Sequence, residues 1–379
     1  MIYLDNAATS FPKPSKVYEE VINCMKNYCA NPGRGSHDMA IKSALKIMEG
    51  RNLISNLFKI KNPLNIAFTS NATEALNIAI KGVLKKGDHV ISTTIEHNSV
   101  LRPLNTMAKR GVDVTLVQCD KGGFINPTDI KDEIKLNTKA IIINHASNVL
   151  GSIQDIRTIG EISKRYGLIF ILDASQSAGS INIDVEKDNI DILAFPGHKG
   201  LLGPQGTGGL YIRDGIDIKP LKEGGTGSSS NLMVQPKEMP DIIESGTSNT
   251  PGIAGLCAGV NFIKKIGIKN IYNEEIKLTK QLLEELGNLP FVKIYGNKSL
   301  ESRVAVVSFN VEGVDSSVVG EKLNEAEIAV RTGYHCAALI HKSIGTEYIG
   351  TVRISPGCFN TSKDIEELIK NIIKIYKLK

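Results

Sequence analysis

The 379-residue sequence has no tryptophan, few aromatic residues (5%) and no strong charge cluster. Its 45 basic and 40 acidic side chains are scattered along the chain, and lysines gather only mildly at 370–379. A nucleic-acid interface usually combines basic clusters with interleaved aromatic residues, whereas scattered charge is typical of solvated helix faces. We therefore expect no nucleic-acid partner.

Long hydrophobic runs are absent as well. No stretch approaches the roughly 18 apolar residues that span a bilayer. The N-terminal residues also lack the basic and apolar regions of a signal peptide. We expect no membrane partner and a cytoplasmic location.

Cysteine pairs at metal-binding or disulfide spacing are missing too. The six cysteines are irregularly spaced and form no Cys-x-x-Cys motif, so reduced thiols are expected. A zinc site built from His335, Cys336 and His341 fits no tetrahedral spacing pattern, and no metal is predicted. The cysteines other than Cys336 lie in helical or strand-like patterns and are expected to be small core residues: Cys24, Cys29, Cys119, Cys257 and Cys358.

The remaining composition, 41% hydrophobic and 22% charged with 35 glycines, is that of a globular protein too long for a single core. Short apolar runs alternate with amphipathic segments, which predicts the α/β class with a mainly parallel central sheet. The expected strands are 65–69, 89–93, 112–117, 140–144, 168–172, 190–195 and 209–212. The expected helices are 15–28, 40–58, 73–84, 155–166 and the long region 253–287.

The pattern changes after about residue 255 to a helix, strands at 304–310 and 351–354, and a terminal amphipathic helix. We therefore predict a large domain over 15–250 and a smaller α+β domain formed by 1–14 and 251–379. The Gly- and Ser-containing segments 224–230 and 246–252 are expected to be mobile loops.

Lys199 and Asp173 are the first candidates for chemistry. Lys199 follows an apolar strand, and a lysine whose cation is disfavoured can form an imine with an aldehyde cofactor. Asp173 ends another apolar strand, where ligands of open α/β sheets bind, and a buried carboxylate there can keep a pyridine nitrogen protonated. The alternatives, a surface lysine in a turn and a helix N-cap, weaken when the two residues are considered together.

The strand, tight turn and helix start at 65–74 can bind an anion. Asn71 and Glu74 resemble a capping box and the Thr73 hydroxyl can add a donor, although capping alone explains the same residues. His97 and Asn148 also follow strands, and an imidazole in such a place can stack on a planar ring or act as a structural hydrogen-bonding group.

The C-terminal part supplies a thiol and a guanidinium group. Cys336 lies in a Gly-containing turn beside His335 and five residues after Arg331, surroundings that can expose a thiolate. Local charge alone leaves the reactivity of this thiol open. Arg353 can pair with a substrate carboxylate or be an ordinary surface arginine.

Together these residues belong to ordered motifs that resemble the cysteine desulfurases of the class V aminotransferase family, which are pyridoxal-phosphate enzymes of fold type I. The resemblance covers nearly the whole chain. Its motifs are Tyr3-Leu4-Asp5-Asn6-Ala7-Ala8-Thr9, Glu96-His97, Ser147-Asn148-Val149-Leu150-Gly151, Asp173-Ala174-Ser175-Gln176, Gly197-His198-Lys199, Gly246-Thr247 and Arg331-Thr332-Gly333-Tyr334-His335-Cys336.

The resemblance implies a role for each matching residue. Lys199 would hold the cofactor pyridoxal 5'-phosphate as an imine, Asp173 would pair with the pyridine nitrogen, and His97 would stack on the ring and take part in catalysis with Cys336. Further implied contacts are Gln176 with the ring oxygen, Thr73 and His198 with the phosphate, Ala72 and Asn148 with the cofactor, and Asn148 and Arg353 with the substrate carboxylate. Thr247 and the substrate-binding His37, in Arg34-Gly35-Ser36-His37, would reach the other subunit's site, which implies a homodimer.

The implied activity is the conversion of L-cysteine to L-alanine, with transfer of sulfur to Cys336 as a persulfide and then to an acceptor protein of unknown identity. The Arg-Thr-Gly-x-His-Cys form is similar to the group II branch, which includes the Suf-type desulfurases and selenocysteine lyases. One departure is Pro196, where the family usually has a hydroxyl residue that helps to bind phosphate. Either Ser175 or backbone groups compensate, or the chain belongs to a divergent subgroup.

Three alternatives stay open at this point. A selenocysteine lyase would release selenide and alanine from L-selenocysteine. A class V aminotransferase or kynureninase-like enzyme would form no persulfide, and a catalytically silent scaffold would form no alanine.

Overall fold

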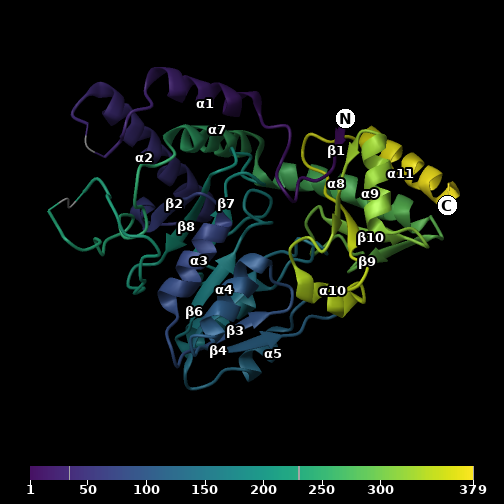
Figure 1. The fold of residues 1–379 in the computed structure, drawn as a ribbon, viewed down its shortest axis with the longest axis horizontal. Coiled ribbons are helices and arrows are strands. Elements are labelled where there is room, and N and C mark those ends of the chain that lie inside the picture. The colour runs from purple at the N-terminus through teal and green to yellow at the C-terminus, as the bar shows by residue number, and fades with distance from the viewer. Residues whose placement is uncertain (34, 229–230, 379) are drawn as a thin grey trace.

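The computed structural model describes residues 1–33, 35–228 and 231–378. Its centre is a seven-stranded sheet in the order β2-β8-β7-β6-β5-β3-β4 (Figure 1). The four pairings among β7, β6, β5, β3 and β4 are parallel, and β8 runs antiparallel to both of its neighbours. The prediction of an α/β fold with a mainly parallel sheet is therefore confirmed. The strands are β2 (Ile66–Thr69), β3 (His89–Thr93), β4 (Asp113–Val117), β5 (Thr138–Asn144), β6 (Ile169–Asp173), β7 (Ile192–Pro196) and β8 (Gly208–Ile212).

The central strands read as continuous apolar runs because both faces of the sheet are covered. In β6, Phe170 and Leu172 belong to one hydrophobic cluster, whereas Ile169 and Ile171 belong to another on the opposite face. The first face packs on α2 (Asp38–Phe58), α6 (Ile156–Tyr166) and α7 (Thr250–Ile266), and the second on α3 (Ala72–Val83) and α4 (Asn98–Ala108). The carboxyl ends of the parallel strands stay open between these layers.

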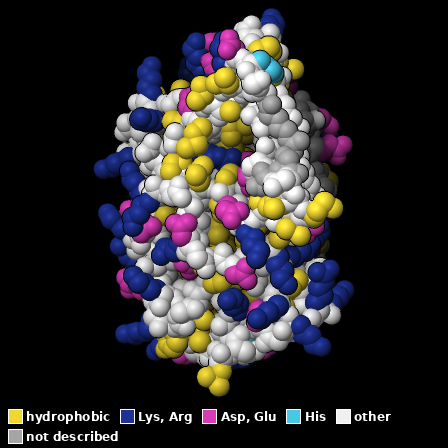
Figure 2. Space-filling view, turned by 90° about the vertical axis from the view of Figure 1, so that its left-hand side faces the viewer, with side chains coloured by type: hydrophobic (Ala, Val, Ile, Leu, Met, Phe, Trp, Pro, Cys, Tyr) yellow, Lys and Arg dark blue, Asp and Glu magenta, His cyan; other side chains and the backbone are white. Residues whose placement is uncertain are grey.

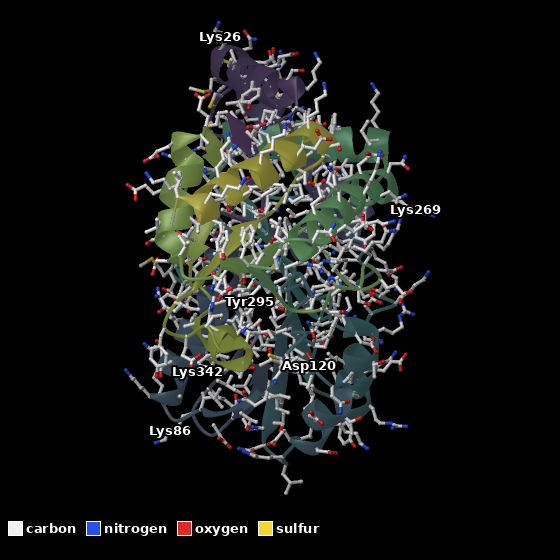
Figure 3. All side chains as sticks on the ribbon, turned by 90° about the vertical axis from the view of Figure 1, so that its right-hand side faces the viewer. Lys26, Lys86, Asp120, Lys269, Tyr295 and Lys342 are labelled. Carbon is white, nitrogen blue, oxygen red and sulfur yellow. The ribbon has the colours of Figure 1, made fainter. Side chains whose placement is uncertain are left out.

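A smaller unit lies at the right of Figure 1, built on the antiparallel sheet β12-β13-β10-β9. The N-terminal residues join it, since β1 (Ile2–Tyr3) pairs with β11 (Ile328–Ala329) and Leu4 belongs to its hydrophobic cluster. Figure 3 views this unit from its own side, with Tyr295 of β9 near the centre. Its other elements are α8 (Ile268–Gly287), β9 (Val292–Tyr295), β10 (Val307–Val311), α9 (Ser316–Glu325), β12 (Arg331–Gly333), α10 (Ala338–Ile344), β13 (Thr351–Ile354) and α11 (Ser362–Lys377).

Several expectations need correction. The region 253–287 is two helices, because Gly267 adopts a φ of 90° between α7 and α8. Residues 250–252 of one expected loop form the first turn of α7, and residues 229–230 of the other lie outside the described residues. Cys29 is exposed, and Cys119 and Cys358 are only half-buried, so just Cys24 and Cys257 are core residues.

Helices α1 (Ser15–Asn27) and α5 (Pro127–Asp132) complete the described elements with the short 3-10 turn Pro63–Asn65.

Over the described part of the chain, no helix combines the length and the apolar character needed to cross a membrane.

Candidate active site

The open carboxyl ends of the parallel strands carry the predicted site residues, and most of these residues line one cavity of about 190 Å³. Strand ends at the same edge of a parallel sheet bring together residues that are far apart in sequence. Of the site residues predicted from the sequence, ten line the cavity: Ala72, Thr73, His97, Asn148, Asp173, Gln176, His198, Lys199, Cys336 and Arg353. Asn144, Ser175, Pro196 and Arg331 line it as well. The sequence alone placed neither Arg331 nor Asn144 there.

Lys199 follows β7 and faces this cavity. Removal from water lowers the pKa of Lys199, Asp173 opposes this effect, and Arg353 and Arg331 add to it, so that the pKa is about 8. The N-terminal segment holds the adjoining backbone, because the Ser10 hydroxyl donates to the Lys199 carbonyl at 2.9 Å and Lys13 Nζ donates to the His198 carbonyl at 2.7 Å. A neutral amine is therefore available close to physiological pH.

Asp173 ends β6 and is 2% exposed. Its Oδ1 accepts hydrogen bonds from the Ser175 N–H at 2.9 Å and from the Ser175 hydroxyl. Burial raises the pKa of Asp173, while the Ser175 bonds and Lys199 lower it. Because Ser175 uses its hydroxyl proton on Asp173, this hydroxyl is not free to replace the donor that Pro196 lacks.

The start of α3 lines one part of the cavity with Asn71, Ala72 and Thr73. Asn71 Oδ1 accepts from the Glu74 N–H at 2.9 Å, but the Glu74 carboxylate accepts from the Ser70 N–H at 2.7 Å instead of returning to Asn71. The expected capping box is therefore only half formed. First-turn N–H groups of a helix lack helical partners, so those of Ala72 and Thr73 are suited to an anion.

His97 is held by Ser99, a residue that sequence reasoning missed. The Ser99 N–H donates to His97 Nδ1 at 3.0 Å, so a neutral ring carries its proton on Nε2. The Ser99 hydroxyl lies 2.7 Å from the same nitrogen and 2.9 Å from the Thr73 hydroxyl. Burial lowers the pKa of His97 to about 4, and Lys199 and Arg331 act in the same direction. The imidazole is therefore neutral at pH 7.

Cys336 reaches the cavity from the turn between β12 and α10. His335 and Cys336 both have a positive φ, 50° and 59°, which is uncommon for residues with a side chain. The turn is tied to the large unit, because the Asn98 N–H donates to the Cys336 carbonyl at 2.8 Å and Asn148 Nδ2 donates to the His335 carbonyl at 2.6 Å. Arg331 Nη2 donates to Cys336 Sγ at 3.3 Å. These contacts fix the thiol on the same cavity as Lys199.

Arg353 is 1% exposed, which excludes an ordinary surface arginine. Its Nη2 donates to Asp5 Oδ1 at 2.6 Å and its Nη1 donates to the Asn148 carbonyl at 3.0 Å. Asp5 lies in a motif quoted above, but the sequence assigned it no role.

Of the three remaining predicted residues, Gln176 lines the cavity of Lys199, whereas His37 and Thr247 do not. Gln176 lines the cavity while its Nε2 donates to the Ala7 carbonyl at 3.0 Å. His37 is the N-cap of α2, and Thr247 lines a second cavity with the loops 31–33 and 225–227. Within one chain, neither of these two residues lines the cavity of Lys199, and Arg34 beside His37 lies outside the described residues.

The fold and cavity define an α/β protein with a polar cavity at the carboxyl edge of its sheet. The family model "Aminotransferase class-V" matches residues 2–368, and the chain belongs to this family. The chain is 37% identical to a probable cysteine desulfurase of Pyrococcus abyssi, over 100% of this chain and 94% of that protein. It is 35% identical to a probable cysteine desulfurase of Methanothermobacter thermautotrophicus, over 99% of this chain and 94% of that protein.

A solved structure agrees with these relatives. The apo structure of cysteine desulfurase from Thermococcus onnurineus NA1 matches with a TM-score of 0.93 and 35% identity, over 100% of this chain and 95% of that chain. The fold is therefore the type I fold of pyridoxal-phosphate enzymes, as the sequence predicted.

Proposed function

We propose that this protein is a cysteine desulfurase that converts L-cysteine to L-alanine and receives the sulfur on Cys336. The observation that carries the proposal is the single cavity lined by Lys199, Asp173 and Cys336. Two relatives that are named probable cysteine desulfurases, and that match over 94% of their length, support the same activity.

The residues of the cavity fit pyridoxal phosphate, which members of this family use. The cavity offers an amine of lowered pKa, a buried carboxylate, a neutral imidazole and a helix N-terminus. Five buried polar atoms of the residues that line it have no partner among the described residues and are candidates to bind a polar ligand: Asn144 Oδ1, Asn148 Oδ1, His198 Nδ1, His335 Nδ1 and Arg353 Nε. When bound, the cofactor supplies an aldehyde for lysine and an electron-withdrawing ring, which Asp173 keeps protonated.

The chain's own residues then perform the proton and sulfur transfers. Lys199 Nζ, as the neutral amine, removes the proton from the substrate Cα. Cys336 Sγ, as the thiolate, attacks the substrate sulfur, so that an S–S bond forms as the substrate Cβ–S bond breaks. The electron pair of the Cβ–S bond stays on Cβ, which takes up a proton to become the methyl group of alanine, and Cα regains the proton that Lys199 removed. The two sulfurs share the oxidation as a persulfide.

Arg353 is the residue that we assign to the substrate carboxylate, with Asn148 beside it. Asn148 Nδ2 gives one N–H to the His335 carbonyl and keeps a second N–H for the ligand. Arg331 adds a further cation to the same wall.

We also propose that the protein acts as a homodimer, in which His37 and Thr247 approach the partner's site, and that an acceptor protein or a small thiol removes the persulfide sulfur. The described surface supports the dimer, because α1 and α2 expose several large apolar side chains. These are Tyr18, Ile22, Met25, Met39, Ile41 and Leu45.

A product assay tests the activity. With less than one equivalent of L-cysteine and no other thiol, wild-type protein loaded with pyridoxal phosphate should form equal amounts of L-alanine and Cys336 persulfide, detected by amino-acid analysis and by mass spectrometry of the peptide. Cys336→Ser should lose the persulfide and slow alanine formation by about 100-fold or more. Cys29→Ser, which removes an exposed thiol, is the matched control and should behave as wild type. A Cys336→Ser protein with the wild-type rate would contradict the assignment.

A further inference from the structure

Arg353 is approached from two sides by groups with different roles. One side belongs to the cavity wall, together with Lys199 and Asn148. On another side, Nη2 donates to Asp5 Oδ1 at 2.6 Å, and Asp5 is not among the residues that line the cavity. Asp5 therefore binds the guanidinium without lining this cavity, and its charge raises the pKa of Lys199 from there.

We propose that Asp5 is a positioning residue that holds Arg353 with one edge of its guanidinium group turned toward the cavity, and so sets the preference for amines that carry a carboxylate. This inference rests on the proposed function, because it takes Arg353 to be the carboxylate-binding group.

The backbone fixes Asp5 in place. Asp5 forms a parallel bridge with Ser355, two residues after Arg353, so the two side chains come from adjacent extended segments. The Ser355 N–H donates to the Leu4 carbonyl at 2.7 Å, and the Ala7 N–H donates to the Ser355 hydroxyl at 2.9 Å. These bonds bracket Asp5 and fix its backbone beside the segment that carries Arg353.

Arg353 is a buried cation, and a buried cation requires an opposite charge beside it. Its side chain is 1% exposed, and among the described residues Asp5 is the acidic side chain that forms an ion pair with it. Burial lowers the pKa of Arg353, and the charge and hydrogen bond of Asp5 act against that effect. Removing one partner of a buried pair leaves an unpaired charge, which reorients or attracts water.

The remaining contacts show what the pair leaves free. Arg353 Nη1 donates one proton to the Asn148 carbonyl at 3.0 Å, and Nε is buried without a partner in the described chain. A guanidinium has five N–H donors in a fixed plane, so Asp5 and Asn148 together set its plane and leave donors for a ligand. Without Asp5, the plane is fixed from one side only.

Binding of two small amines to the protein loaded with pyridoxal phosphate tests the inference without requiring turnover. L-Alanine carries a carboxylate, and ethylamine is the same molecule without it. The change in the visible spectrum of the bound cofactor gives both dissociation constants.

We expect Asp5→Ala to weaken L-alanine binding about tenfold, as for the loss of a charge-assisted hydrogen bond that orients a ligand group. Ethylamine binding should change less than about twofold, because this ligand makes no use of Arg353. Asp5→Glu should restore part of the preference. With L-cysteine, the same variants should raise KM and leave kcat nearly unchanged.

Asn6→Ala is the matched control. Asn6 Nδ2 donates to the Ser355 carbonyl at 3.0 Å, so this change loosens the same segment without touching Arg353. If Asn6→Ala loses the preference as Asp5→Ala does, or if Asp5→Ala weakens both ligands equally, Asp5 is only an anchor of the N-terminal segment and the inference is wrong. Tighter binding of L-alanine to Asp5→Ala would make Asp5 a competitor of the ligand and would also overturn it.

The two proposals fail separately. A wild-type protein that binds L-alanine no better than ethylamine removes the assigned role of Arg353, and with it the basis of the proposed function's substrate site. A wild type with a clear preference that Asp5→Ala retains removes only the inference about Asp5.

Discussion

The reactivity of Lys199 depends on its neighbours more than on its own side chain. An exposed lysine titrates near 10.4. Removal from water lowers the pKa of Lys199, Asp173 opposes this effect and nearby guanidinium groups add to it, with a net pKa of about 8. The same cations and the loss of solvent keep His97 neutral. Above about pH 8, one cavity therefore contains an unprotonated amine and an unprotonated imidazole.

This balance predicts the pH dependence of Lys199 in the cofactor-free protein. Only the neutral amine reacts with an acylating reagent, so labelling of Lys199 should rise tenfold per pH unit and level off above about pH 8. Arg331→Met removes a cation that lowers this pKa, so its profile should move to higher pH. Pulse labelling followed by mass spectrometry of the Lys199 peptide measures both profiles.

Lys85→Met removes an exposed cation and serves as the control, with an unchanged Lys199 profile. A wild-type profile that levels off only near pH 10.4, the pKa of a free lysine side chain, would contradict the burial argument.

The pKa of Lys199 also affects stability. Because it is lower in the folded than in the unfolded chain, the unfolded chain binds more protons between about pH 8 and 10.4. Lys199 therefore makes the free energy of unfolding rise with pH across that window.

The site residues form two groups: those that the sequence pattern can identify and those that only the folded structure reveals. Lys199, Asp173 and His97 follow apolar strands, and the carboxyl end of a strand is a place that sequence can identify. Ser99, Asp5 and Arg331 act through contacts with His97, Arg353 and Cys336 that exist only after folding. Polar residues near a strand or helix end are common, so their types alone gave no signal.

At the scale of elements, burial decides which segments can be predicted. The strands β6 and β7 are buried on both faces and appear in the sequence as apolar runs. Their bounds predicted from the sequence therefore agree with those in the structure to within two residues at each end. The strands β11 and β12 have two and three residues, too few for a periodic pattern. The division between α7 and α8 depends on one glycine with a positive φ inside an otherwise helical pattern.

Two helical glycines give opposite predictions for the same substitution. A Cβ at Gly160 of α6 would lie 2.0 Å from the Asp188 carbonyl oxygen, whereas a Cβ at Gly287 of α8 meets nothing within 4 Å. Gly160→Ala should therefore lower the free energy of unfolding by about 2 kcal/mol or more, because backbone must move. Gly287→Ala should raise it by about 0.5 to 1 kcal/mol through the smaller entropy of the unfolded chain.

Denaturant unfolding of the two variants beside wild type measures these changes, and each variant is the control for the other. Equal effects of the two substitutions would mean that the close approach of α6 to the Asp188 backbone does not limit the side chain at position 160.

At the scale of the whole molecule, the site lies where two units meet. The large unit supplies Lys199 and Asp173, and the C-terminal unit supplies Cys336 and Arg353. Contacts such as Asn98 to Cys336 and Asn148 to His335 join the units at the cavity itself. Long-range pairing of this kind has no local sequence pattern, which is why the sequence joined Cys336 and Arg353 to the site of Lys199 only through the resemblance to a family.

The proposed dimer is the remaining prediction at this scale. Hydrophobic side chains gather in the upper half of the face in Figure 2, which is the side of the molecule where α2 lies in Figure 1. On α2, Ile41 and Leu45 are one helical turn apart and 50% and 64% exposed. Such a surface is unfavourable in water and is suited to an interface between copies of the chain.

Wild-type protein should therefore elute from a sizing column with light-scattering detection at twice the mass of one chain. The double variant Ile41→Glu/Leu45→Glu should elute as a monomer, because like charges would face each other across a two-fold interface. If Thr247 of one subunit contacts the cofactor of the other, the monomer should also lose pyridoxal phosphate on dialysis while keeping its helical circular dichroism.

The double variant Leu136→Glu/Leu378→Glu is the control. It changes two exposed leucines outside α1 and α2 and should remain a dimer with bound cofactor. A monomeric wild type that retains the cofactor would show that one chain completes the site without His37 and Thr247 of a partner.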